Sequence, residues 1–146
     1  MHERLLTDEA ERIWVVVPER GTDAVATIEA WARRRGVTAA RVSAIGGFDR
    51  AVLGWFDWDA KDYRRIEVGE QCEVVALLGD IAVSGDSVKL HVHAVLGQAD
   101  GTAKAGHLLE GIVRPTLEVM VVQSPAHLAR KHDPITGLAL LDPESR

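Results

Sequence analysis

The sequence has a single cysteine, few aromatic residues and no long apolar run. Cys72 cannot form an internal disulfide, and the apolar segment around it predicts a small buried thiol in a strand. The apolar runs are all far shorter than the roughly 20 residues that a membrane-spanning helix needs. The charged first residues also lack the apolar core of a secretory signal. We therefore expect a soluble, cytoplasmic protein.

An excess of positive charge is also absent. Lys and Arg number 17 against 22 Asp and Glu, which gives a formal net charge of −5. Contacts of cations with phosphates supply most of the affinity for nucleic acids, so direct binding to nucleic acid is disfavoured. The composition, 47% hydrophobic and 27% charged, is typical of a globular protein, and we expect residues 1–146 to form one domain. At this length a domain folds without a structural metal, so a bound metal would be functional.

One helix is predicted near the start of the chain. Apolar residues recur at helical spacing over residues 24–35, and Thr22 or Asp23 can cap the first turn. Three arginines followed by Gly36 are typical of a helix C-terminus. A short apolar run at residues 12–17 predicts a strand before this helix.

The rest of the chain is rich in short β-type runs separated by turn residues, among them Gly46-Gly47, Gly79-Asp80 and Gly85-Asp86. Segment 124–131 has the composition of one or two helical turns. Short connections favour antiparallel neighbours, so we predict an α+β fold, a mostly antiparallel sheet with helices packed on one face. The predicted strands are 40–45, 51–57, 63–68, 73–78, 81–84, 88–96, 117–122 and a last apolar run at 138–141.

Two histidines share one face of a predicted strand. In Leu90-His91-Val92-His93 the side chains alternate, so His91 and His93 point to the same side. A hairpin turn centred on Asp100 would place His107 directly opposite His93. Three imidazoles from adjacent strands would leave an open coordination position, as in catalytic zinc sites, although nitrogen ligands also suit nickel, copper or iron.

The histidine pair also allows other interpretations. A His-x-His pair is also common on ordinary protein surfaces, where it binds nothing. A cupin barrel would need a glutamate where Leu96 and Gly97 stand. The sequence has no nucleophile elbow and no glycine-rich phosphate loop, so serine hydrolase and nucleotide chemistry are unsupported.

Several segments together resemble the plants-and-prokaryotes conserved (PPC) domain. The resemblance spans about residues 12–142 and is most specific between His91 and Gly111. It is carried by Ala44-Ile45-Gly46-Gly47, Leu53-Gly54-Trp55-Phe56-Asp57, the run from Cys72 to Ile81, Leu90-His91-Val92-His93, and Gly106-His107-Leu108-Leu109-Glu110-Gly111.

The resemblance implies a single α+β domain, a homotrimer, and a metal held by His91, His93 and His107. From the nitrogen ligands we expect this metal to be zinc. Plant members carry AT-hooks that enter the minor groove of DNA, and through them the family has a DNA-binding label. This chain has no Arg-Gly-Arg-Pro segment, so the label does not transfer to it. The exposed aromatic residues expected at Trp55–Trp58 also favour self-association.

Two functional alternatives stay open on the sequence. The first is a homo-oligomer with a divalent metal and a small ligand, which would be metal-dependent if it is an enzyme. The second is a non-catalytic assembly module, self-associating or bound to a transcription factor, whose histidines are structural. The family label would give such a module a DNA-binding or transcription-related role. Glu73, Glu110 and Glu118 are candidates for handling protons beside a metal, and none is assigned this role.

Overall fold

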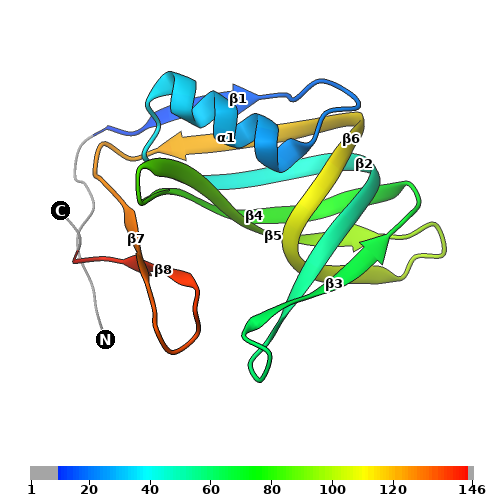
Figure 1. The fold of residues 1–146 in the computed structure, drawn as a ribbon. Helices are drawn as coiled ribbons and strands as arrows, with labels where there is room; N and C mark the ends of the chain where they lie inside the picture. The colour runs from blue at the N-terminus through cyan, green and yellow to red at the C-terminus, as the bar shows by residue number, and fades with distance from the viewer. Residues whose placement is uncertain (1–9, 145–146) are drawn as a thin grey trace.

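The computed structural model describes residues 10–144, in which one helix lies against a single eight-stranded sheet (Figure 1). Every strand pair is antiparallel except β4 with β7. The predicted α+β class is confirmed, with a single helix in the described part of the chain. The elements are β1 (Arg12–Val16), α1 (Ala24–Arg35), β2 (Ala39–Asp57), β3 (Asp62–Val68), β4 (Cys72–Ser84), β5 (Ser87–Gly97), β6 (Ala103–Gln123), β7 (Ala129–His132) and β8 (Ala139–Asp142).

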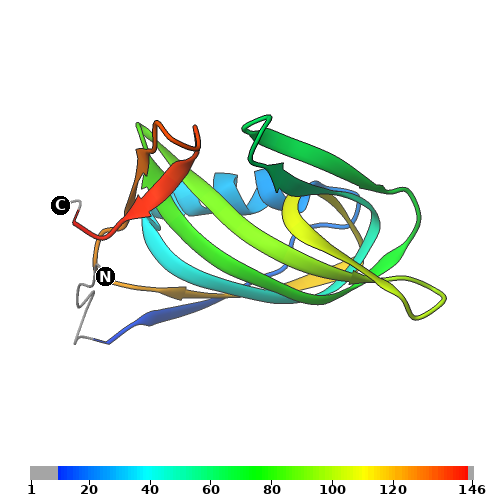
Figure 2. The same cartoon turned by 90° about the horizontal axis from the view of Figure 1, so that it is seen from below.

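Four strands pair in a closed ring. β2 pairs with both β4 and β6, and β5 pairs with the same two strands. The other strands extend the ring, with β1 beside β6, β3 beside β2, and β7 with β8 beside β4. Figure 2 shows this sheet from below, with α1 behind it and the β2–β3 and β7–β8 hairpins projecting near β5. These two hairpins lie on either side of the predicted histidine site.

The helix closes the core on one face of the sheet. Asp23 is its N-cap, and its two carboxylate oxygens accept hydrogen bonds from the backbone N–H groups of Ala26, at 2.8 Å, and Gly111 in β6, at 2.9 Å. Gly36 ends the helix in the left-handed conformation, as predicted. Ile28 and Trp31 are buried against the sheet. No helix in residues 10–144 is long and apolar enough to span a bilayer.

The predicted turn at Gly46-Gly47 is wrong, because β2 runs on as one bent strand through both residues. The register with β4 and β6 shifts here, and Gly46 has a positive φ of 146°. A Cβ at Gly46 would overlap the Thr116 carbonyl oxygen, and one at Gly47 would overlap that of Arg114. The two glycines therefore mark a β-bulge that allows β6 to approach closely.

The predicted break at Gly79-Asp80 is also wrong, since β4 is continuous through it. A Cβ at Gly79 would overlap the carbonyl oxygen of His91 on β5. The glycine is required by the close approach of the strand that carries the histidines, and it forms no turn.

The predicted helical turn at 124–131 is wrong, because residues 124–128 form a non-helical loop and the residues after them belong to β7. The end of β4 binds this segment through a 2.8 Å hydrogen bond from the Val83 N–H to the Leu128 carbonyl. Leu128 packs with Ala39 and Ala82 in a second apolar cluster. Tertiary pairing therefore overrides the local helical propensity. The last predicted strand is confirmed as β8.

Candidate metal centre

Strand β5 presents two histidines on the face opposite to the core. Leu90, Val92 and Ala94 are buried, whereas His91 is half-buried and His93 is exposed. This alternation is the one predicted from the sequence. The apolar face of β5 packs in the main core, so the positions of both histidines are fixed by the burial of their neighbours.

The β5–β6 hairpin brings in the third histidine. Its turn holds Gly101 at a φ of 83°, and the Asp100 carboxylate accepts a 2.9 Å hydrogen bond from the Thr102 N–H. The register then pairs His93 directly with His107. The register expected for a turn centred on Asp100 is confirmed.

The three rings converge on one point. Each of His91, His93 and His107 offers a ring nitrogen, and these nitrogens all lie within 4.8 Å of one another. The ring centroids are 5.0 to 5.5 Å apart. In residues 10–144 no other group of three or more His, Cys, Asp or Glu side chains lies close enough together to hold a metal ion. The structure therefore places the three predicted ligands together.

Their environment favours the neutral imidazole, which is the form that binds metals. Burial, together with the charges of His91, His93 and Arg130, lowers the pKa of His107 from 6.5 to about 4. Burial and the Arg130 charge also lower the pKa of His91, although Asp80 opposes them. Both rings are therefore uncharged at neutral pH.

His107 also has an unused ring nitrogen. Its Nδ1 is buried and has no hydrogen-bond partner. A buried polar atom without a partner is costly and uncommon in a folded protein. A metal ion bound at this nitrogen would satisfy it, so the residues present fit such an ion.

Tyr63 of β3 is a residue of the site that the sequence did not indicate. Its ring stacks on that of His107 with the centroids 4.7 Å apart and an interplanar angle of 20°. A Cβ at Gly54 on the adjacent strand would overlap the Tyr63 ring. The glycine thus makes room for a tyrosine that restrains the orientation of His107.

Asp80 and Arg130 complete the surroundings of His91. An Asp80 carboxylate oxygen lies 3.9 Å from His91 Nδ1, and its other oxygen accepts a 2.5 Å hydrogen bond from Arg130. Asp80 could have been found from the sequence, since a two-residue turn at Gly85-Asp86 places it opposite His91. Nothing in the sequence indicates that Arg130, on the distant strand β7, reaches this site.

The other candidates are not part of the cluster. The three glutamates considered for proton transfer, Glu73, Glu110 and Glu118, are absent from the cluster of metal-ligating side chains. His127 and His132 are exposed and also lie outside it. His2 falls outside the described residues. Cys72 is free and buried, as predicted, and its burial raises the pKa of the thiol.

Solved structures with the same fold include archaeal and bacterial proteins. A plant- and prokaryote-conserved protein from Pyrococcus horikoshii gives a TM-score of 0.87 at 24% identity, with 94% of this chain and 97% of that chain covered. A metal-containing protein from Archaeoglobus fulgidus gives 0.86 at 31% identity, with coverage of 94% and 98%. A protein from Bacteroides thetaiotaomicron, named as a candidate DNA-binding protein, gives 0.87 at 27% identity, with coverage of 93% and 98%.

Comparison with curated protein sequences gives no match. The family model described as the Plants and Prokaryotes Conserved domain matches residues 6–125. This match covers most of the chain, and it includes all three histidines of the cluster. The chain therefore belongs to the Plants and Prokaryotes Conserved domain family.

Proposed function

We propose that this protein binds one divalent metal ion per chain through His91, His93 and His107. The convergence of three ring nitrogens within 4.8 Å, with the buried His107 Nδ1 lacking a partner, carries the proposal. The relative from A. fulgidus, at 31% identity, is a metal-containing protein, which supports the same function here.

Zinc is the ion that we expect. Neutral imidazole nitrogens suit zinc, and three protein ligands with one open position are typical of catalytic zinc sites. When bound, a divalent ion supplies Lewis acidity, so any reaction at this site would be metal-dependent. Tyr63 and Asp80 would orient two of the three ligands, because each lies against a different ring.

The test is elemental analysis of protein purified without a polyhistidine tag. We expect about one equivalent of a single metal per chain in the wild type and little metal in His93→Ala. His93 is exposed, so its removal should leave the fold intact, which circular dichroism would verify. His132→Ala is the matched control, because His132 is also an exposed strand histidine and should not affect the metal content.

Two results would contradict the metal site. One is wild-type protein that contains no metal even after incubation with zinc. The other is a folded His93→Ala variant that retains the full metal content. Either result would favour the non-catalytic assembly module, in which the histidines serve structure alone.

We also propose that the protein assembles with copies of itself through the face of the sheet opposite to α1. One row of residues on this face runs across β1, β6, β2 and β4. Along it, neighbouring strands pair Val15 with Met120, Met120 with Ser43, and Ser43 with Leu78. Val15 is 68% exposed, Leu78 61% and Met120 44%, and this row contains no charge.

Monomeric soluble proteins rarely expose large contiguous apolar patches, and symmetric assembly buries such a patch against its own copy. The family resemblance implies a homotrimer, which is the assembly that we expect. Direct binding to DNA is not proposed, because the net charge of −5 opposes contact with phosphates.

A further inference from the structure

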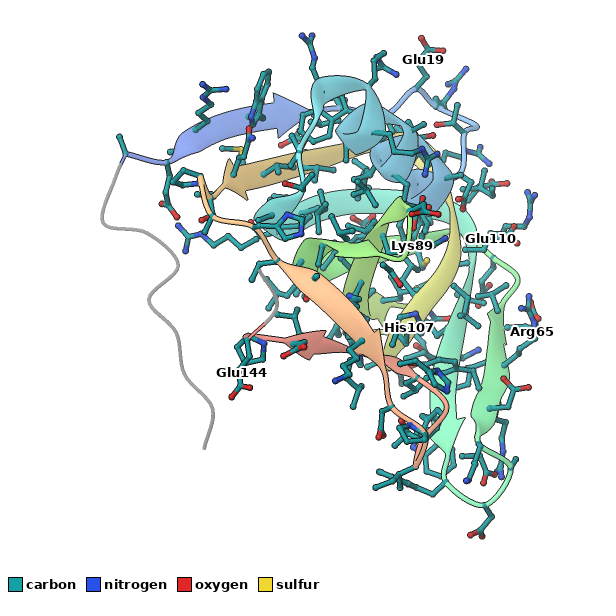
Figure 3. The ribbon with its side chains drawn as sticks, turned by 60° about the vertical axis from the view of Figure 1, so that its left-hand side comes forward. Glu19, Arg65, Lys89, His107, Glu110 and Glu144 are labelled. Atoms are coloured by element: carbon teal, nitrogen blue, oxygen red, sulfur yellow. The ribbon has the colours of Figure 1, made fainter. Side chains whose placement is uncertain are left out.

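A pocket of about 310 Å³ opens beside the histidine cluster. His91 and His107 form part of its wall, and Leu138 and Leu140 of the β7–β8 hairpin form another part. Figure 3 labels two of its lining residues, Lys89 and His107. This volume is at the lower end of the range of about 300–1,000 Å³ typical of sites for small molecules.

The charged residues of the pocket wall are basic. Arg130 and Lys89 both line the pocket, and none of its described lining residues is acidic. The Arg130 side chain is only 7% exposed. Its Nη2 donates to Asp80 and its Nη1 donates to the Ala139 carbonyl at 3.2 Å, whereas its buried Nε has no partner.

The metal ligands add no negative charge to this wall. Three neutral imidazoles leave the full charge of a divalent ion uncompensated, unlike a site with carboxylate or thiolate ligands. Asp80 is nearby and is already paired with Arg130. The pocket with its ion would therefore carry a net positive charge, which favours an anionic ligand.

The rest of the pocket wall is apolar, so it favours an anion that also has an apolar part. Leu138, Leu140 and the ring of Tyr63 offer carbon surface to a ligand. An inorganic phosphate would leave this apolar surface uncovered. A monocarboxylate with a short carbon chain matches the basic part of the wall with its carboxylate and the apolar part with its carbon chain.

We propose that this pocket binds a small organic carboxylate. The carboxylate lies between the histidine cluster and Arg130, and the carbon chain packs against Leu138 and Leu140. The inference rests on the proposed metal site, since the ion contributes part of the positive charge.

The test is calorimetric titration of zinc-loaded protein, with the metal content of each sample measured separately. The probes are acetate, butanoate and hexanoate, with butanamide as the neutral equivalent of butanoate and inorganic phosphate as the competing anion. We expect saturable binding of butanoate or hexanoate, at least tenfold tighter than butanamide and tighter than phosphate.

Two substitutions test the basic wall. Arg130→Lys keeps the charge that pairs with Asp80 but removes the Nε donor, and we expect about tenfold weaker binding of butanoate. Lys89→Gln should weaken binding about threefold, because Lys89 is 54% exposed and also pairs with Glu29. Lys131→Gln is the matched control, since Lys131 is an exposed neighbour of Arg130 that does not line this pocket.

The possible results distinguish a failure of the carboxylate pocket from a failure of the metal site. If the protein holds one zinc and none of the acids binds, or if butanamide or phosphate binds as well as butanoate, the carboxylate pocket is wrong and the metal site stands. If butanoate binds selectively to protein that takes up no metal, the metal site is wrong and the pocket stands on Arg130 and Lys89 alone.

Discussion

At the scale of single residues, His107 is largely buried, and this burial favours the uncharged form of its ring. In the folded protein it binds a proton only near pH 4, whereas in the unfolded chain it does so near 6.5. Between these values the unfolded state binds the additional proton. The free energy of unfolding therefore falls as the pH is lowered through this window.

We predict that metal-free protein loses about 1–3 kcal/mol of stability from His107 between pH 6.5 and 4, as urea unfolding in the presence of a chelator would measure. The range allows for the partial exposure of the ring. His107→Gln should flatten this part of the profile, whereas the exposed control His132→Gln should not. His91, whose pKa is also lowered, adds to the loss in this window, so some slope remains in His107→Gln. The lowered carboxyl pKa values of Asp57, Asp100 and Asp133 act mainly below pH 4, at the lower end of the window. A wild-type profile as flat as that of His107→Gln would contradict the prediction.

At the scale of elements, the position of β5 depends on Gly79 in the neighbouring strand β4. β4 passes the backbone of His91 at Gly79, where no side chain fits. The strand that carries two of the three histidines is therefore held close to β4 by the absence of a Cβ atom.

We predict that Gly79→Ala destabilises the protein by about 2–4 kcal/mol, because the new methyl group must displace the backbone at His91. The metal content of Gly79→Ala should also fall, because the displaced backbone would move the His91 ring. Gly69→Ala is the matched control, because a Cβ there meets nothing within 4 Å, and its stability should stay within about 0.5 kcal/mol of the wild type. Chemical unfolding of both variants checks the pair, and equal stabilities would refute the role given to Gly79.

The histidine cluster was predictable because it depends only on residues that are close together in the sequence. Alternation along one strand and the length of one hairpin are enough to bring His91, His93 and His107 together. Arg130 and Tyr63 were not predictable from local patterns. Arg130 lies on β7, which pairs with the distant strand β4, and Tyr63 reaches His107 only because β2 pairs with the distant strand β6. The sequence also cannot distinguish a bulge from a turn at Gly46-Gly47, because glycine permits both and the outcome depends on the close approach of β6.

At the scale of the whole molecule, the two faces of the sheet differ in their surroundings. The inner face is covered by α1, whereas the outer face exposes the row of Val15, Met120 and Leu78. Along this row Leu78 pairs with His93, so the apolar surface continues to the histidine cluster.

We predict that Met120→Glu converts the assembly to monomers, or raises its dissociation constant at least tenfold, because a charge would then be buried between copies. Sedimentation velocity over a range of concentrations would measure this. Ile135→Glu is the control, because Ile135 is 72% exposed and lies between β7 and β8, away from the row. Wild-type protein that sediments as a monomer at every concentration would rule out the assembly.

The ring of four strands limits how copies can join. β2, β4, β5 and β6 each have at least two strand partners, so little of their backbone remains free to accept a strand from another molecule. The outer edges in the described chain belong to short strands, β1, β3 and β8. Copies that meet through the sheet face must therefore associate by side-chain packing, which favours a closed assembly of finite size over an open-ended fibril.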